Sequence, residues 1–560
     1  MKRLFVGAFL LSLSFHPAQA DVVMPTIFGN HMVLQQDAKL PVWGWADPDE
    51  KVKVTLGTTS LEASAAPDGA WRVEFPAQAR VENDAPQILT VAGKNTLTYQ
   101  DVLIGDVWIA SGQSNMGFGI LNDDRGAQAV AGADKPKIRL FRVPCETALE
   151  PRRGDGIKGE WLVCSPENLK ATSPQGFSAA AYYFGSEIFR VTGRPVGLIG
   201  TYWGGTPAEA WTSLTGLEKE PSLAAYVAEH QKFAASYPET SVAYPKLKAD
   251  YDAANKAWFD QTGKEYYKAT EAWVAAATAA TAAGKPVPPK PKQAVPRDKP
   301  PIPPDGGQSA PTTLFNAMVA PLIPFAIKGV IWYQGEANVK SPKGEYAILF
   351  ARLISDWREK WGQGDFPFIF VQLANVGTPA TSPTPKEGVG YPLVREGQLR
   401  ALSLPATGMA VAIDIGNPFN IHPKDKVDIG LRLALAARHV AYGEDLVFSG
   451  PIYQSMNIEG NKIRLTFTNT GSGLKMGVPP WTPTGKPPEP PTELTGFGIA
   501  GADQKWVWAK AVIEGDTIVV SSDEVAAPVA VRYGWASCPP CNLYNQEGLP
   551  ASPFRTDDWK

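Results

Sequence analysis

The sequence predicts an α/β fold built on a parallel, three-layered sheet, with β-rich regions before and after it. In the middle of the chain, apolar strand-like runs alternate with helical stretches at 179–191 and 346–361. Strands that alternate with helices in this way predict a parallel sheet. The strand-like runs are 102–111, 196–201, 329–333, 368–373 and 409–413.

Short runs of alternating apolar and polar residues occur toward both ends of the chain. Residues 51–56 and 70–75 lie near the start, among Gly, Pro and Asp turns, which is the pattern of a small β-sandwich. Residues 462–467 and 517–521 show that β character returns near the end.

The length of the chain implies several domains. Its 560 residues exceed the roughly 250 to 300 residues at which a single hydrophobic core stops growing. We expect a β-sandwich region at 21–100, an α/β domain at 101–445 and a C-terminal β region at 446–560. Residues 217–307 interrupt the α/β domain as an insertion with helical composition. Its Pro- and Lys-rich part, 284–304, is expected to be an extended surface strap.

Composition and the first residues bear on partners and location. With 44% hydrophobic residues, 19% charged residues and a formal charge of -3, the chain reads as globular, and nucleic acid is not expected as a partner. Lys2 and Arg3 precede an apolar run over 4–15, and small residues end at Ala20. This is the pattern of a signal peptide cleaved after Ala20. The run is too short to span a bilayer, so we expect a periplasmic or secreted protein without a membrane anchor.

Four cysteines are present, and an exported protein can form disulfides. Cys538 and Cys541 have the spacing of a thiol redox site, but they lie in a turn-like context, which favours a structural turn or a local disulfide. The pairing stays open, with Cys145 and Cys164 as the other two cysteines. The spacing of the four gives only a weak zinc signal, and no metal is expected.

Histidines are few, so the candidates for a general base near neutral pH are few. The sequence around His31, His230 and His439 indicates that these histidines are structural or exposed. His422 differs, because it lies in a loop between a predicted strand and a predicted helix. That is the end of the sheet at which α/β folds place ligands and catalytic groups.

A serine lies at the corresponding end of another strand. Ser114 follows the run 102–111 in a sharp turn, which exposes its hydroxyl and lets its amide serve as an oxyanion donor. A serine in such a turn can equally be a helix N-cap. Gly204 and Gly205, after 196–201, offer backbone amides free of Cβ, and Gln334 offers a side-chain amide after the next strand.

This order of serine, glycine, amide and histidine resembles the SGNH (GDSL-type) hydrolases. The closer resemblance is to the sialate O-acetylesterase-like branch, which includes acetylxylan-type carbohydrate esterases. It covers most of the chain outside 217–307. The matching motifs are 28–36 (FGNHMVLQQ), 105–116 (GDVWIASGQSNM), 203–211 (WGGTPAEAW), 314–318 (LFNAM), 332–336 (WYQGE), 421–424 (IHPK) and 552–559 (SPFRTDDW).

The resemblance implies a serine esterase that removes O-acetyl groups from sugars without a metal or organic cofactor. Ser114 would be the nucleophile and His422 the general base. The oxyanion hole would consist of the amides of Ser114 and of Gly204 or Gly205, together with Gln334.

The acid of the triad departs from the family pattern. The acid is usually an Asp two or three residues before the histidine, but Asn420 and Phe419 occupy those positions here. This leaves a serine–histidine dyad, or an acid from elsewhere in the chain, for which Glu336 is the first candidate and Asp414 the second. Glu336 can equally be an acceptor that anchors loops, and Asn420 can orient His422 through a neutral hydrogen bond.

Substrate identity stays open at this point. Acetylated hemicellulose, such as xyloglucan or xylan, and O-acetylated sialic acid share the same ester chemistry, and the long insertion favours a polymer. Several aromatic residues beside the motifs are candidates for a sugar-binding wall or for core packing. The alternatives are a non-catalytic carbohydrate-binding protein and a lipase or peptidase. The aromatic residues are Trp203, Trp211, Trp332 and Tyr333.

Overall fold

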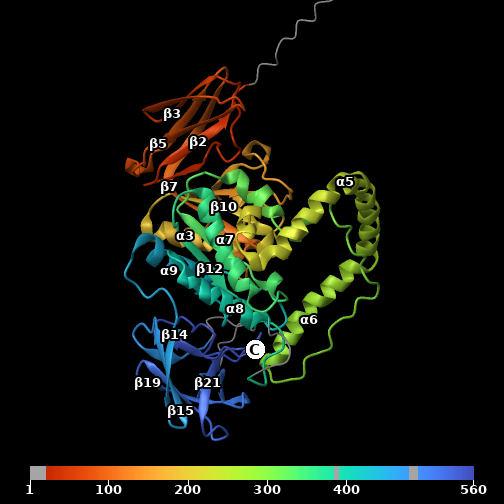
Figure 1. The fold of residues 1–560 in the computed structure, drawn as a ribbon, viewed down its shortest axis with the longest axis vertical. Coiled ribbons are helices and arrows are strands. Elements are labelled where there is room, and N and C mark those ends of the chain that lie inside the picture. The colour runs from red at the N-terminus through yellow and green to blue at the C-terminus, as the bar shows by residue number, and fades with distance from the viewer. Residues whose placement is uncertain (1–20, 384–389, 479–489, 560) are drawn as a thin grey trace, which may run out of the picture.

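The structure is a computed structural model that describes residues 21–383, 390–478 and 490–559. The predicted signal peptide at 1–20 lies outside the described residues. In Figure 1, the red N-terminal strands lie at one end of the long axis and the blue C-terminal strands at the other, with the helix-rich part between them.

The central sheet is parallel, as the sequence predicts. Its strand order is β13-β12-β11-β7-β10-β8, and β9 pairs antiparallel to β8 at the edge. Every pair from β13 to β8 is parallel, and β10, β11 and β12 are buried along their whole length. Burial on both faces explains their continuous apolar sequences. The strands are β7 (Thr96–Gly112), β8 (Lys135–Arg142), β9 (Trp161–Cys164), β10 (Val196–Tyr202), β11 (Gly329–Tyr333), β12 (Phe368–Gln372) and β13 (Thr407–Val411).

Helices pack on this sheet to complete a mixed α/β fold. Helices α3 and α9 contact each other, α3 contacts β10, and α9 contacts β12 and β13. Helix α8 contacts β12 and also α7. The predicted helices at 179–191 and 346–361 are confirmed as α3 and α7. The bounds are α3 (Ala179–Thr192), α7 (Glu345–Trp361), α8 (Gly390–Arg400) and α9 (Val427–Tyr442).

The N-terminal strands join the central sheet through one long strand. The first part of β7 pairs antiparallel with β6, and its later part pairs with β10 and β11. The domain boundary expected at residue 100 therefore falls inside a continuous strand. The other N-terminal strands are β1 (Val33–Gln35), β2 (Leu40–Trp45), β3 (Lys51–Leu56), β4 (Thr59–Ser64), β5 (Ala70–Phe75) and β6 (Gln87–Ala92).

Two hydrophobic cores form on this framework. The first runs from Val22 to Ala437 and includes side chains from both the N-terminal strands and the α/β part. The second belongs to the C-terminal strands, from Ile463 to Phe554. Those strands are β14 (Ile452–Glu459), β15 (Lys462–Thr468), β16 (Leu474–Met476), β17 (Phe497–Gly501), β18 (Trp506–Trp508), β19 (Lys510–Glu514), β20 (Thr517–Ser521), β21 (Pro528–Tyr533), β22 (Leu543–Asn545) and β23 (Phe554–Arg555).

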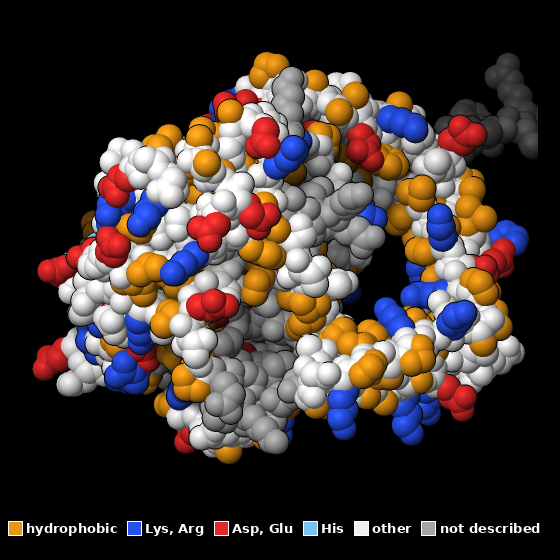
Figure 2. Space-filling view, turned by 90° about the horizontal axis from the view of Figure 1, so that it is seen from below, with side chains coloured by type: hydrophobic (Ala, Val, Ile, Leu, Met, Phe, Trp, Pro, Cys, Tyr) orange, Lys and Arg blue, Asp and Glu red, His pale blue; other side chains and the backbone are white. Residues whose placement is uncertain are grey.

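Two long helices, α5 (Ala224–Trp258) and α6 (Lys264–Ala282), occupy most of the segment 217–307. Figure 1 shows them projecting from the α/β part as an arch, and Figure 2 shows an opening between this arch and the rest of the molecule. Residues 285–304, which follow α6, form neither helix nor strand. They run along the arch, where Trp258 Nε1 donates to the Val295 carbonyl over 2.8 Å.

Ion pairs on the surface of α5 help to stabilise this exposed helix. Only His230 of its 35 residues is buried, so packing contributes little along most of its length. Lys246 and Asp250 form an ion pair one helical turn apart, and two further lysine–aspartate pairs follow at the same spacing. Pairs of this kind stabilise a helix by about 0.2 to 0.5 kcal/mol each. Among the described residues, no helix is long and apolar enough to cross a membrane.

Candidate active site

Ser114 and His422 meet at the carboxyl end of the central sheet. The Ser114 Oγ and the His422 Nε2 lie 2.8 Å apart, although the residues are separated by 308 positions in the chain. Both side chains are half-buried. A hydroxyl within hydrogen-bond distance of an imidazole nitrogen is the geometry that a nucleophile and its general base require.

The register of the sheet explains why the other motifs gather here. Gly112, the last residue of β7, lies opposite Tyr202 at the end of β10 and opposite Tyr333 at the end of β11. Three neighbouring strands thus end at the same level. Gly112 has a φ of 130°, and a Cβ there would lie 2.2 Å from the Tyr333 carbonyl oxygen. Only glycine fits this close approach, which turns the chain into the Ser114 loop.

The glycine loop lies beside the serine. A Cβ at Gly204 would lie 3.3 Å from the Ser114 Cβ, so the backbone of Gly204 approaches Ser114 closely. Gly205 has a φ of 74°, a conformation that favours glycine. The side chain of Gln308 secures the loop by donating from Nε2 to the Gly204 carbonyl over 3.0 Å. The loop is therefore held with its backbone against Ser114.

Gln334 has a different role from the predicted oxyanion donor. Its side chain is completely buried. The two hydrogens of its Nε2 go to the Thr206 carbonyl, at 3.2 Å, and to Asn338 Oδ1, at 2.6 Å. Because both are used inside the protein, none remains for a substrate oxygen. Gln334 instead joins the β11 loop to the glycine loop.

Neither carboxylate considered as the triad acid contacts His422. Both oxygens of Asp414 accept hydrogen bonds from Arg432, at 2.6 and 2.8 Å. Glu336 Oε1 accepts from Asn115 Nδ2 at 2.6 Å. Glu336 thus anchors Asn115, the residue that follows Ser114. Asn420 Oδ1 accepts from the His422 backbone N–H at 2.9 Å rather than from the imidazole.

The remaining histidines of the described chain have structural partners, as their sequence context suggests. His31 Nδ1 lies 2.6 Å from Asp101 Oδ2. His230 Nδ1 lies 3.0 Å from the Thr312 hydroxyl, and the His439 ring stacks on Phe448 with 3.9 Å between ring centroids. Among the histidines of the described chain, His422 is therefore the one that pairs with a serine hydroxyl.

A pocket of about 360 Å³ opens beside the Ser114–His422 pair. Trp203 lines it, whereas Trp211, Trp332 and Tyr333 are fully buried in the core. Of the aromatic residues considered as sugar contacts, only Trp203 is in place to meet a ligand here. The lining residues are Ser114, Gly117, Phe118, Asn122, Arg142, Cys145, Ser173, Gln175, Tyr202, Trp203, Gly204 and His422.

Arg142 is the permanent cation among these lining residues, and the protein itself uses its donors. The Nη1 group donates to the carbonyls of Val143 and Gly200. The Nη2 group donates to the Tyr202 carbonyl over 2.8 Å and to Cys145 Sγ over 3.3 Å. Both forked nitrogens are therefore occupied. A bidentate clamp on a substrate carboxylate, the interaction in which arginine excels, is not open to Arg142 in this arrangement.

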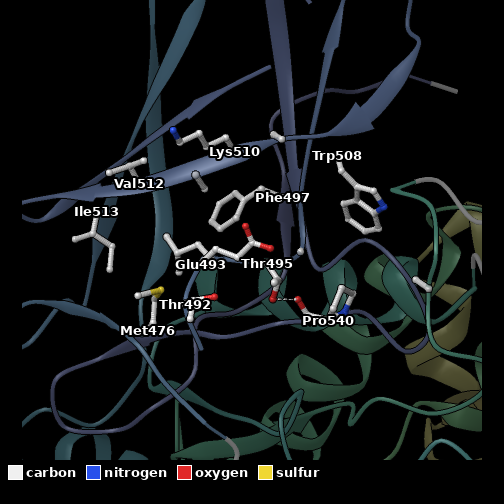
Figure 3. A pocket seen from close by; sticks show the side chains of 15 residues that line it. Met476, Thr492, Glu493, Thr495, Phe497, Trp508, Lys510, Val512, Ile513 and Pro540 are labelled. Atoms are coloured by element: carbon white, nitrogen blue, oxygen red, sulfur yellow. Dashed lines mark hydrogen bonds between the residues drawn. The ribbon is translucent and has the colours of Figure 1, made fainter. Parts of the chain in front are cut away.

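A larger cavity, of about 840 Å³, lies among the C-terminal strands. Figure 3 shows Phe497 and Trp508 among its lining side chains, with Glu493 and Lys510 as the charged groups. Neither histidine nor serine lines the described part of this cavity, so it lacks a serine–imidazole pair like that of Ser114 and His422. The chemistry places the candidate active site at Ser114 instead.

The four cysteines are free thiols in the structure. Cys164 and Cys538 are buried, and Cys145 is exposed. Burial raises the pKa of Cys164 to about 12 and also raises the pKa of Cys538. A thiol kept protonated is a poor nucleophile. Cys538 is therefore not activated as a thiolate nucleophile.

Two residues next to the predicted pair were not assigned from sequence. Asn115 and Lys426 are completely buried, and Lys426 Nζ donates to Asn115 Oδ1 over 2.8 Å. Asn115 directly follows the serine and Lys426 is four residues after the histidine, so proximity in the chain was the available signal. Phe118 is a third such residue, because its ring stacks on His422 at 6.4 Å between centroids.

The electrostatics favour a neutral imidazole. Burial lowers the pKa of His422 below its usual 6.5, and the positive charge of Lys426 lowers it further. Burial likewise lowers the pKa of Lys426, to about 7. A histidine that stays unprotonated near neutral pH is available to take a proton from Ser114.

Comparisons with known proteins bear on the class to which this protein belongs. Residues 308–439 match the family described as carbohydrate esterase, sialic acid-specific acetylesterase. Sialate O-acetylesterase of Rattus norvegicus is 28% identical over 94% of this chain and 92% of its own length. The protein of that name from Homo sapiens is also 28% identical, over 94% of this chain and 90% of its own length.

A solved structure extends the similarity to three dimensions. A carbohydrate acetylesterase from Xanthomonas citri has 35% sequence identity and a TM-score of 0.72, over 96% of this chain and 100% of that one. These similarities define the protein as a carbohydrate O-acetylesterase, a hydrolase of carboxylic esters. The chain belongs to the sialate O-acetylesterase-like family of carbohydrate esterases. None of these similarities supports the alternative of a non-catalytic sugar-binding protein.

Proposed function

We propose that the protein hydrolyses O-acetyl esters of neutral sugars in hemicellulose, such as xyloglucan or xylan, with Ser114 as nucleophile and His422 as general base. The observation that carries the catalytic part is the 2.8 Å contact between Ser114 Oγ and His422 Nε2 beside a pocket. The substrate part rests on the pocket lining.

The reaction proceeds in two steps. Ser114 Oγ attacks the acetyl carbonyl carbon while His422 Nε2 takes the hydroxyl proton. The tetrahedral intermediate collapses, and the sugar oxygen leaves with that proton as a hydroxyl group. The acetyl group is now on Ser114. His422 then takes a proton from water, the water oxygen attacks the acetyl carbon, and acetate leaves as Ser114 regains its proton.

Backbone amides stabilise the negative charge of the intermediate. The Ser114 amide and the amide of Gly205, or of its neighbour Gly204, are the donors that we assign to the oxyanion hole. A backbone donor needs no reorientation during the reaction, which is why a preorganised amide is effective. Gln334 is left out of this assignment because its amide hydrogens go to Thr206 and Asn338.

A neutral sugar suits the described pocket better than sialic acid does. Sialic acid carries a carboxylate, whose recognition favours a cation with free donors. Arg142 has both forked nitrogens occupied. The polar groups left for a ligand include the side-chain amides of Asn122 and Gln175. These groups match sugar hydroxyls, and Trp203 supplies an apolar face for a pyranose ring.

Acetate release measured by NMR tests both parts of the proposal. The substrates are acetylated xyloglucan, acetylated xylan and 9-O-acetyl sialic acid, each with wild type and with Ser114→Ala. We expect release from a neutral polymer that falls by about 10³-fold or more in the variant. Equal release by both proteins contradicts the serine mechanism. Serine-dependent release that is fastest from sialic acid contradicts only the substrate class.

We also infer three organisational features that go with this function. The α/β part is an SGNH-type, three-layered domain, supported by the parallel strand order and by the place of Ser114 after β7. Residues 217–307 are an insertion into it, supported by the arch of α5 and α6. Residues 1–20 are a signal peptide that directs export to the periplasm or outside the cell, for which N-terminal sequencing of the secreted protein is the test.

A further inference from the structure

We propose that Asn115, Lys426 and Glu336 form a buried clamp that holds His422 against Ser114 by gripping the backbone on both sides of the histidine. This inference rests on the proposed function. The three are positioning residues, because they act on the loop that carries His422 and not on the substrate.

The imidazole itself has little to restrain it from the far side. Its Nε2 faces Ser114, and no hydrogen bond joins its Nδ1 to any side chain in the described parts of the chain. A carboxylate at Nδ1 normally fixes the orientation of a catalytic histidine. Both candidates for that position are engaged elsewhere, Asp414 with Arg432 and Glu336 with Asn115.

The loop around His422 also lacks regular structure. Residues 420–426 lie between β13 and α9 without helix or strand, and Ile421 is 40% exposed. Loops with few apolar contacts open more readily than packed elements. A histidine on such a loop needs another restraint to stay within hydrogen-bond distance of the serine.

The clamp supplies that restraint through two hydrogen bonds to the backbone of the loop. Asn115 Nδ2 donates to the Ile421 carbonyl over 3.0 Å, and Lys426 Nζ donates to the Pro423 carbonyl over 2.6 Å. Ile421 and Pro423 are the two neighbours of His422 in the chain. Because Asn115 is also the neighbour of Ser114, these contacts fix the serine and the histidine in one frame.

Every polar atom of the Asn115 side chain is used in this arrangement. Its Nδ2 donates to Ile421 and to Glu336 Oε1, and its Oδ1 accepts from Lys426 Nζ. Glu336 orients the amide, since a carboxylate can only accept and so turns the nitrogen toward itself. Glu336 therefore acts on His422 through Asn115.

Lys426 also supports the face of the histidine ring. Its Nζ lies 4.7 Å from the centroid of the Phe118 ring, and that ring stacks on His422. A buried ammonium is destabilising unless charges and hydrogen bonds compensate it. The carboxylates of Glu336, Asp123 and Asp425 act on its charge. Retaining such a group under the active site fits a role in positioning.

The first test replaces Lys426. Lys426→Met keeps the length of the side chain and removes the ammonium, and Lys426→Arg keeps a cation with donors. With p-nitrophenyl acetate we expect Lys426→Met to lower kcat by roughly 10- to 100-fold with KM changed by less than about threefold, by analogy with residues that orient metal ligands. Lys426→Arg should recover part of that loss. The matched control is Lys135→Met, a half-buried lysine on β8 whose Nζ contacts Ser186, and it should leave kcat unchanged.

The pH profile separates positioning from a general structural role. Removing the Lys426 charge should move the acid limb of kcat/KM toward higher pH, because that charge lowers the pKa of His422. Lys135→Met should not move it. Unchanged kcat and an unmoved limb in Lys426→Met would overturn the proposal. If Ser114→Ala is inactive in the same assay, the proposed function survives that outcome.

The second test replaces Glu336 and does not depend on whether the lysine variant folds. Glu336→Gln keeps an oxygen that accepts from Asn115, and Glu336→Ala removes it. We expect Glu336→Gln to retain kcat within about fivefold and Glu336→Ala to lose roughly 10- to 100-fold. Equal, large losses in both folded variants, as judged by circular dichroism, would overturn the clamp, because they would show that the charge is what the reaction needs.

Discussion

At the scale of single residues, the pKa of His422, the proposed general base, is expected to set the pH range of the reaction. The imidazole must be neutral to accept the Ser114 proton, and burial followed by the Lys426 charge lowers its pKa. The neutral form therefore persists to lower pH than for a free histidine.

We expect kcat/KM on p-nitrophenyl acetate to be constant near neutral pH. Below that range it should fall tenfold per pH unit, with a midpoint below about 6.5. A midpoint above 7 would contradict this account. Buffers of constant ionic strength keep the comparison free of screening effects.

The sequence and the structure indicate different roles for the Gln334 side chain. As an oxyanion donor, its loss would reduce the rate about a hundredfold or more. As a buried link between two loops, its loss removes the hydrogen bonds that its side chain makes with the Thr206 carbonyl, Asn338 Oδ1 and the Tyr346 hydroxyl. Unsatisfied buried groups cost about 1 to 3 kcal/mol each.

We therefore expect Gln334→Ala to lower the free energy of unfolding by about 1 to 3 kcal/mol. Its kcat/KM, measured at a temperature where the variant is folded, should fall by less than about tenfold, well short of the loss of an oxyanion donor. Denaturant titration and steady-state kinetics give the two numbers. Gln372→Ala is the matched control, since Gln372 is also buried and donates to Ser552 Oγ over 2.9 Å. A hundredfold loss of rate at unchanged stability would return Gln334 to the oxyanion hole.

At the scale of elements, the arch of α5 and α6 reaches the loop that carries the histidine. The ring of Trp273 on α6 packs edge-on against Phe419, with 5.6 Å between centroids. Phe419 is three residues before His422. At its base the arch is closed, because a Cβ at Gly306 would lie 2.6 Å from the Phe233 ring. The arch thus contacts the rest of the molecule near Gly306 at its base and at Phe419 in the loop that carries His422.

This geometry predicts that the arch serves long substrates. Replacing residues 236–302 by a short Gly/Ser linker should lower kcat/KM for an acetylated polymer by roughly tenfold or more, because remote contacts with a polymer contribute to its turnover. Turnover of p-nitrophenyl acetate should change by less than about threefold. Trp273→Ala alone shows how much of the effect comes from the Phe419 contact. Equal changes for polymer and small ester would contradict this role.

At the scale of the whole molecule, a buried arginine connects the two hydrophobic cores. Arg395 on α8 is completely buried, and its Nη1 and Nη2 donate to the carbonyls of Ala536 and Ser537 in the C-terminal region. Its other donors go to Leu373 and Ala374 after β12. Burial lowers the pKa of Arg395 to about 10.

A chain ending at residue 450 should therefore be less stable than the full chain by several kcal/mol, because a buried charge that loses its acceptors is strongly destabilising. Adding Arg395→Met to the truncated chain should recover part of that loss, whereas the same change should destabilise the full chain. Thermal unfolding of the four proteins completes a double-mutant cycle. A truncated chain as stable as the full one would show that the C-terminal strands are an independent module.

The sequence was sufficient to predict the main elements and the proposed catalytic pair. Alternation of apolar runs with helical stretches located β7, β10, β11 and β12, because periodicity is a local property that burial enforces. Parallel strands end at one edge, so Ser114 and His422 could be assigned to one site from their places after strands and from the family motifs.

The tertiary structure alone decided how the polar groups are shared out. Asp414 pairs with Arg432, the Gln334 amide goes to Thr206 and Asn338, and Glu336 holds Asn115. Each choice is a competition among several possible partners, settled by differences of about an ångström in hydrogen-bond geometry. The same holds for the single core that joins the N-terminal strands to the α/β part, since side-chain packing across β7 is invisible in local patterns.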